Sequence, residues 1–177
     1  MEQLAGSHIF VDESARQGRY ILCATAIAAA NSNRIRAAVM ALRPKGSSRI
    51  HMKQVDKRSA IPIIAGVATL DAHSTLFVVH KRCSTREARD LALGVAFDHL
   101  YKSGAVRAVI ESCEQDHEDR RVIRNAIGTQ TRLHYDHEPA GCTNALLWIP
   151  DIHAWAWGRG GKARQTIDHR ITVLDLR

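Results

Sequence analysis

The sequence predicts one α/β domain, in which a mixed sheet of five strands has helices on both faces. Three observations lead to this fold class. The chain has 177 residues, of which 45% are hydrophobic, and this is enough to form one core without disulfides or a structural metal. Short apolar runs typical of strands alternate with segments in which apolar residues recur every three or four positions. No linker, internal repeat or low-complexity tract divides residues 1–177.

Five segments have the apolar and partly β-branched composition of strands. A short turn at 17–19 separates the first two, which predicts an antiparallel hairpin. The first strand ends on Asp12 and Glu13, and the fourth ends on Glu111. The third is apolar throughout, as central strands are. The predicted strands span 8–13, 20–27, 75–79, 106–111 and 133–135.

The predicted helices follow from their caps and from their apolar spacing. Ser84 and Glu87 form a capping box ahead of the most regular apolar pattern in the chain. Asn31 is expected to cap the first helix, and Pro62 to lie in the first turn of a short second one. Both helices belong to an insertion at about 31–72, before the third strand. The predicted helices span 31–43, 61–67, 84–103, 116–127, with Asp116 as the cap, and 146–157.

The sequence also predicts where the protein is located and whether its cysteines are reduced. No apolar run reaches the roughly 20 residues that a membrane span needs, so we expect no membrane contact. The segment after Met1 has neither the basic nor the apolar region of a secretory signal, which predicts a cytoplasmic protein. Its cysteines are then expected to be reduced thiols. They are Cys23, Cys83, Cys113 and Cys142.

The balance of charge favours a polyanionic partner. The chain has 25 Lys and Arg against 18 Asp and Glu, for a net charge of +7 and a pI near 9.6, and each cation that meets a phosphate releases a counterion. A basic tail covers about 159–177, where 171–173 is a candidate additional strand. Aromatic residues make up 5% of the chain, which does not indicate a single-strand binder built on a series of base-stacking platforms. Five residues are candidates for binding nucleic acid: Lys45, Arg49, Lys53, Arg120 and Arg124. In the alternative interpretation they belong to an ordinary solvated surface.

The order of strands and helices matches the RNase H-like fold. In that fold the first and fourth strands are neighbours, and the last helix packs across their ends. Asp12, Glu111 and Asp151 are therefore expected to meet, although they are far apart in the sequence. Hard cations such as Mg²⁺ or Mn²⁺ take oxygen ligands, and a pair of them clamps the attacking and leaving oxygens of a phosphodiester. The pattern predicts a metal-dependent nuclease acting on DNA or RNA.

Each candidate residue has a role and an ordinary alternative. Asp12 is expected to bridge two metal ions, with Glu111 and Asp151 at their sides; in the alternative these acids end strands or cap a helix. Glu13 is a weaker metal ligand, because successive strand residues point to opposite faces. His51 is expected to orient the attacking water or carry a proton, and is otherwise a surface histidine.

Two motifs resemble a known family. Asp12-Glu13-Ser14 follows an apolar strand, and Leu147-Trp148-Ile149-Pro150-Asp151 leads into a Trp-rich helix, with an isolated His51 between them. Together they resemble the bacterial DESG family, a domain-of-unknown-function family with an RNase H-like fold. The resemblance implies metal-dependent nuclease activity and assigns acids to Asp12, Glu111 and Asp151. Departures are Ala15 for the usual Gly, and Trp148 and Pro150 in the last motif, where Pro150 is expected to start the helix.

Other functions stay open. A catalytically inactive RNase H-like module that binds nucleic acid or protein fits the basic surface and the altered motif at Pro150. Hydrolysis of a small phosphoester would use the same acids, and a homodimer is possible. Zinc has weak support because no Cys-x-x-Cys pair occurs. Its candidate ligands would be Cys113, His117, His134, His137 and Cys142.

Overall fold

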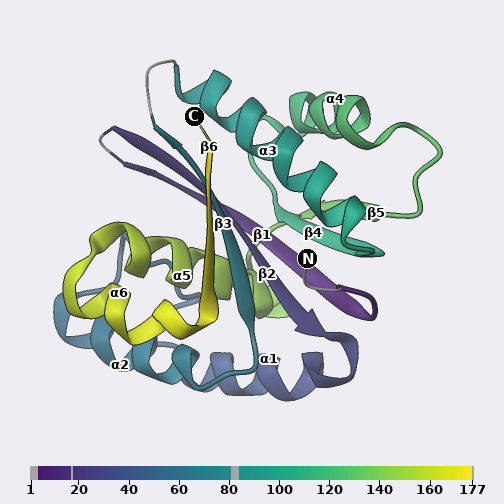
Figure 1. The fold of residues 1–177 in the computed structure, drawn as a ribbon. Coiled ribbons are helices and arrows are strands. Elements are labelled where there is room, and N and C mark those ends of the chain that lie inside the picture. The colour runs from purple at the N-terminus through teal and green to yellow at the C-terminus, as the bar shows by residue number, and fades with distance from the viewer. Residues whose placement is uncertain (1–3, 17, 81–83, 177) are drawn as a thin grey trace.

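A six-stranded mixed sheet forms the centre of the protein in a computed structural model that describes residues 4–16, 18–80 and 84–176 (Figure 1). The strand order is β5-β4-β1-β2-β3-β6. The pairs β1–β2 and β2–β3 are antiparallel, and the other three pairs are parallel. The strands are β1 (Ser7–Arg16), β2 (Arg19–Ala28), β3 (His73–His80), β4 (Arg107–Glu111), β5 (His134–Glu138) and β6 (Ile171–Leu176).

Helices cover both faces of this sheet. The helices α3 (Thr85–Lys102) and α4 (Asp116–Ile127) lie on one face, and the other four lie on the opposite face (Figure 1). Those four are α1 (Ser32–Ala41), α2 (Lys57–Ala68), α5 (Trp148–Arg159) and α6 (Gly161–Ile167). Short 3-10 helices span Ala29–Asn31, Cys142–Leu147 and Asp168–Arg170.

Alternation along the strands produces two separate cores. Phe10 of β1 and Ile21 of β2 pack with α1, α2, α5 and α6. Their neighbours Ile9 and Leu22 face α3 and α4. Side chains of a strand point to opposite faces in turn, so a sheet buried on both sides has apolar runs without a polar face. The predicted α/β class and its helices on both faces are therefore confirmed.

The predicted strand count of five is wrong, because the C-terminal segment adds a sixth strand. β6 pairs with β3 from Ser74↔Ile171 to Val79↔Leu176. The predicted basic tail at 159–177 is thus the end of α5, then α6, a 3-10 helix and β6. β6 is an edge strand with three exposed residues among its six, so it lacks the continuous apolar run that marks a central strand.

Several element boundaries also differ from the prediction. The helix α2 begins at Lys57, because the Asp56 carboxylate accepts hydrogen bonds from the backbone N–H groups of Arg58 and Ser59. Pro62 lies inside this helix, not in its first turn. Asp116 is the first residue of α4 and not its cap. In α2 the cap at Asp56 moves the helix start about one turn earlier than predicted. In α4 the cap position is Gln115, one residue before Asp116.

The ends of β1 and α5 matter most for the site. β1 continues to Arg16, so Asp12 and Glu13 lie within the strand and not at its end. The predicted hairpin with β2 is confirmed from Ser7↔Ala28 to Arg16↔Arg19, while Gln17 of the predicted turn lies outside the described residues. The helix α5 begins at Trp148, two residues before Pro150, and a proline in a first turn removes no helical hydrogen bond.

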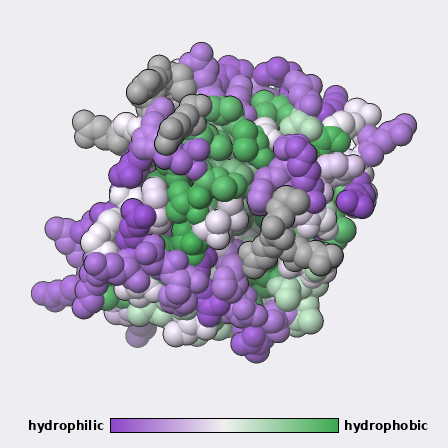
Figure 2. Space-filling view, in the orientation of Figure 1, coloured by the Kyte–Doolittle hydropathy of each residue, from purple (hydrophilic) through white to green (hydrophobic). Residues whose placement is uncertain are grey.

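Figure 2 shows mostly hydrophilic side chains on the face seen in Figure 1, with an apolar patch that runs down from the upper centre of the view. Exposed apolar side chains of the described residues include Leu91 of α3 and Val173 of β6. The described residues contain no helix that is long and apolar enough to cross a membrane. Cys23, Cys113 and Cys142 are free thiols, and Cys83 lies outside the described residues.

Candidate active site

Asp12 and Glu111 come from neighbouring parallel strands. β1 and β4 pair as far as Val11↔Ile110, and the two acids follow directly. Because parallel strands in register keep successive residues side by side, their carboxyl groups lie within hydrogen-bonding distance of each other. Both line a pocket of about 180 Å³. The sheet therefore places these two acids together directly after the last paired residues of β1 and β4.

Asp151 reaches the same pocket from α5. It lies in the first turn of this helix and is 7% exposed. One carboxylate oxygen, Oδ2, accepts a hydrogen bond of 2.8 Å from the backbone N–H of Met52 and lies 3.3 Å from Nδ1 of His51. The loop between α1 and α2 is thus attached to α5 by its contact with Asp151, and this contact brings His51 into the pocket.

The start of α5 is fixed by a further contact. Nε1 of Trp148, which is 1% exposed, donates a hydrogen bond of 2.9 Å to the carbonyl oxygen of Ala140. The N-terminal end of a helix favours a negative charge, because the dipole of the helix is positive there. The Trp148 side chain therefore anchors the first turn of α5, the turn that contains Asp151.

Crowding of negative charge is the main electrostatic feature of the pocket. Burial and the nearby charges of Glu111 and Asp151 raise the pKa of Asp12 well above its ordinary value. Arg49 partly offsets this, since its positive charge lowers the same pKa and its Nη1 lies 2.9 Å from Oε1 of Glu111. Three carboxylates that repel one another are stabilised most by a multivalent cation placed among them.

The donor set fits hard divalent cations. Asp12, Glu111 and Asp151 supply only carboxylate oxygens, the ligands preferred by Mg²⁺ and Mn²⁺. The raised pKa of Asp12 is what a cation would reverse. His51 and Lys53 complete the polar lining near these acids. All the residues expected at the metal centre line this pocket, namely Asp12, Glu13, His51, Glu111 and Asp151.

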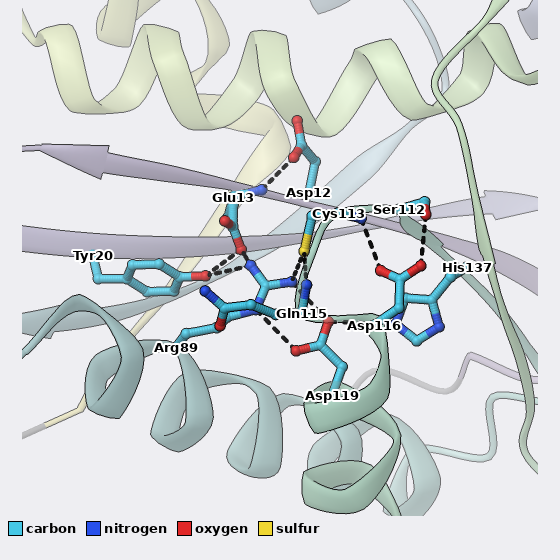
Figure 3. Close-up of polar contacts among 10 residues, drawn as sticks. All are labelled: Asp12, Glu13, Tyr20, Arg89, Ser112, Cys113, Gln115, Asp116, Asp119 and His137. Carbon is cyan, nitrogen blue, oxygen red and sulfur yellow. Dashed lines mark hydrogen bonds and ion pairs between the residues drawn. The ribbon is translucent and has the colours of Figure 1, made fainter.

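Glu13 has different surroundings. Figure 3 shows its carboxylate on the side of the sheet opposite that of Asp12, as the strand alternation predicted. It forms an ion pair with Arg89 and accepts a hydrogen bond from the Tyr20 hydroxyl. Its contribution to a metal site stays a prediction, and this carboxylate already has a cationic partner.

The sequence did not predict the position of Arg89 at the pocket. Its guanidinium, on α3, is 5% exposed and lines the pocket. It holds Asp119 through two hydrogen bonds, from Nε at 2.9 Å and from Nη2 at 2.7 Å. These bonds and the Arg89 charge outweigh burial and lower the pKa of Asp119. A charged residue between the buried Ala88 and Ala92 of a helix was the available signal, because such a charge needs a partner.

A second group of metal-type ligands lies beside Arg89. Ligand atoms of Cys113, Asp116 and Asp119 lie within 4.8 Å of one another. Asp119 is already bonded to Arg89 and to Nε2 of His137, and Nη2 of Arg89 also donates to Sγ of Cys113 at 3.2 Å. A cation there would meet a guanidinium at close range, so the carboxylates around Asp12 are the better metal site.

Of the residues predicted to bind nucleic acid, two lie at the pocket and three lie elsewhere on the surface. Arg49 reaches Glu111, and Lys53 lines the pocket. Lys45 is exposed in the loop between α1 and α2. Arg120 and Arg124 are exposed on α4, on the sheet face opposite α5. Cys142, a residue of the weak zinc prediction, donates its thiol to the carbonyl oxygen of Ser48 at 2.9 Å, away from the group around Arg89.

The sheet order, the helices on both faces and the three converging acids define an RNase H-like fold, as the sequence predicted. No family model matches the chain, and no curated protein sequence matches it either. Solved structures do resemble it. The PCNA:RNase HII complex from Archaeoglobus fulgidus superposes with a TM-score of 0.56 and 11% identity, over 92% of this chain and 75% of that one.

Two structures of Bst-RNase HIII are also similar. The Q54A mutant has a TM-score of 0.53 and 16% identity, over 85% of this chain and 51% of that chain. The structure in complex with Mn²⁺ has a TM-score of 0.52 and 15% identity, over 86% and 52%. The matched region is therefore about half the length of these RNase HIII chains, and at such identities the similarity establishes the fold alone.

Proposed function

We propose that this protein is a metal-dependent nuclease that hydrolyses phosphodiester bonds of DNA or RNA. The observation that carries the proposal is the convergence of Asp12, Glu111 and Asp151 in one pocket, where burial and the charges of the other two acids raise the pKa of Asp12. The fold of RNase HII and RNase HIII, one of them crystallised with Mn²⁺, supports it. So does the resemblance of the Asp12 and Asp151 motifs to the DESG family.

The position of each residue in the pocket suggests its role in the reaction. Two bound Mg²⁺ or Mn²⁺ ions would supply a hydroxide nucleophile at neutral pH and stabilise charge on the leaving oxygen. Asp12, Glu111 and Asp151 would hold these ions, and Asp12, which interacts with both other acids, would be shared by the two. His51 contacts Asp151 through Nδ1, which leaves Nε2 to accept a proton from water or to give one to the leaving oxygen.

The test compares wild type with Asp12→Asn, Asp151→Asn and the control Asp136→Asn, which removes an exposed acid of β5. Labelled single-stranded and double-stranded DNA, RNA and hybrid are incubated with Mg²⁺, Mn²⁺ or EDTA. We expect metal-dependent cleavage that falls at least about 10³-fold in the two site variants, because cation binding supplies most of the transition-state stabilisation. The control variant should cleave like wild type. Cleavage by Asp12→Asn at the wild-type rate in Mn²⁺ would overturn the proposal.

A second candidate function is an inactive module that keeps the fold and binds nucleic acid or protein. The observation that favours it is the contact of Arg49 with Glu111, which gives one of the three acids a cationic partner within the chain. Titration of Mn²⁺ into the metal-free protein separates the two, because an inactive module has no need of a metal site. The homodimer and the cytoplasmic location stay predictions from the sequence.

A further inference from the structure

The end of α5 and the end of the β1–β2 hairpin form a cluster of four arginines on two tryptophans. On Trp155 lie the guanidinium carbons of Arg16, 5.7 Å from the ring centroid, and Arg159, at 5.1 Å. On Trp157 lie those of Arg19, at 5.5 Å, and Arg164, at 4.5 Å. We name this group the arginine–tryptophan cluster; its members are Arg16, Arg19, Trp155, Trp157, Arg159 and Arg164.

The side chain of Arg16 is held in a defined position in this cluster. Its Nη2 donates a hydrogen bond of 3.0 Å to the carbonyl oxygen of Trp155. Its side chain passes over Gly158, where an added Cβ would lie 2.8 Å from Cδ of Arg16 and still closer to Nε. The glycine therefore makes room for Arg16 against the helix backbone. Because α5 is helical at this position, alanine would be compatible with the backbone and would conflict only with Arg16.

The cluster has an excess of positive charge. Among the residues that the structure describes, the ion pair found for these four arginines is Arg164 with Asp168, at 3.7 Å. Burial and the like charges of Arg159 and Arg19 lower the pKa of Arg16. Holding like charges together costs free energy in the free protein, and an anion that binds between them recovers it. Guanidinium groups that are fixed on aromatic rings are also already oriented for bidentate hydrogen bonds to phosphate.

The position of the cluster relates it to the pocket. Arg16 is four residues beyond Asp12 on β1, about 13 Å along a strand. Arg159 is eight residues beyond Asp151 on α5, about 12 Å along a helix. Both elements thus lead from the carboxylates to the cluster. Successive nucleotides of one strand rise about 3.4 Å in a duplex, so the separation equals three or four nucleotides.

We propose that the arginine–tryptophan cluster binds the backbone phosphates of a nucleic-acid strand. These phosphates would lie a few nucleotides from the phosphodiester bond that is cleaved at Asp12. This inference rests on the proposed function and extends its substrate contacts to residues outside α4 and outside the loop between α1 and α2. Two arginines already lie on each indole, so the tryptophans orient the guanidinium groups and do not act as platforms for bases.

The test measures binding without metal, so that it does not depend on cleavage. Fluorescence anisotropy of a labelled 24-nucleotide single strand is followed in EDTA as NaCl is raised. In the double variant Arg16→Gln/Arg159→Gln we expect about tenfold weaker binding at low salt. The slope of log K against log salt should fall by about 1.4, the value for two lost phosphate contacts on a single strand.

Two further variants control for net charge. Gly158→Ala keeps every charge but displaces Arg16, so we expect binding to weaken about threefold. Arg34→Gln removes one exposed arginine of α1 and should change binding less than twofold. A double variant with the same salt slope as wild type, or with no larger defect than Arg34→Gln, would overturn the inference.

Two outcomes separate this inference from the proposed function. If the double variant binds poorly but no substrate is cleaved under any metal condition, the cluster stands and the nuclease proposal fails. If cleavage depends on Asp12 while the double variant binds like wild type, the nuclease stands and the cluster fails. A labelled polyglutamate peptide serves as a competitor. If it binds as tightly as the oligonucleotide and only through Arg16 and Arg159, the partner is an acidic protein and the inference is wrong.

Discussion

Adjacent residues of β1 place two carboxylates on opposite sides of the sheet, and their surroundings are opposite in character. Asp12 faces Glu111 and Asp151, and its pKa is raised by burial and by their charges. Glu13 faces Arg89, which also neutralises the fully buried Asp119. On one side three carboxylates gather, and of these Glu111 forms an ion pair with Arg49. On the other side the buried Arg89 forms ion pairs with both Glu13 and Asp119. The first arrangement is suited to binding a metal, and the second to holding α3, α4 and β1 together.

This comparison predicts that Arg89 is structural above all. Arg89→Met would leave Asp119 buried without its partner, and breaking one side of a buried ion pair costs about 3–5 kcal/mol. We therefore expect the free energy of unfolding in urea to fall by that amount. Arg86→Met is the control, because its pair with Glu118, at 3.6 Å, is exposed and should contribute under 1 kcal/mol. Equal losses in the two variants would show that the Arg89 network does not hold the fold.

The same contrast explains what the sequence could and could not reveal. Asp12, Glu111 and Asp151 were predictable because each interrupts or ends an apolar segment, and the order of elements brings their positions together. The role of Arg89 was not, because its partners lie 30 residues later and on β1, and a helical pattern does not identify partners so distant. β6 was only a candidate because an edge strand buries little. The early start of α2 depends on one carboxylate, that of Asp56.

Divalent cations should affect the two sides differently. A ligand that binds only the folded state stabilises it by about 2.7 kcal/mol at a hundred times its Kd. We expect Mn²⁺ or Mg²⁺ to raise the Tm of wild type, and the rise to be lost in Asp12→Asn. Asp116→Asn, which alters the group beside Arg89, should keep the rise. A rise that is lost in Asp116→Asn but kept in Asp12→Asn would move the metal site to the other side of the sheet.

The smallest expected effect is a gain of stability in the metal-free Asp12→Asn protein. Asparagine keeps an oxygen that accepts the hydrogen bond from the Glu13 backbone N–H, and it removes one of three repelling charges. We expect a gain of about 1 kcal/mol at neutral pH, since most of the crowding is relieved. The control Asp136→Asn should change stability by less than 0.5 kcal/mol, which is roughly the limit for surface substitutions.

The pH dependence of this gain follows from the direction of the pKa shift. An unfolded aspartate titrates near 3.9, and folding raises the pKa of Asp12. The folded state therefore holds its proton more tightly, and wild type loses stability relative to Asp12→Asn as the pH rises from about 4 through the raised pKa. Thermal unfolding in EDTA from pH 4 to pH 8 should show a difference in Tm that is smallest at pH 4 and grows toward neutrality. A difference that shrinks with rising pH would mean that Asp12 is stabilised as a carboxylate, by a cation of the protein itself, and the two sides of β1 would then be alike.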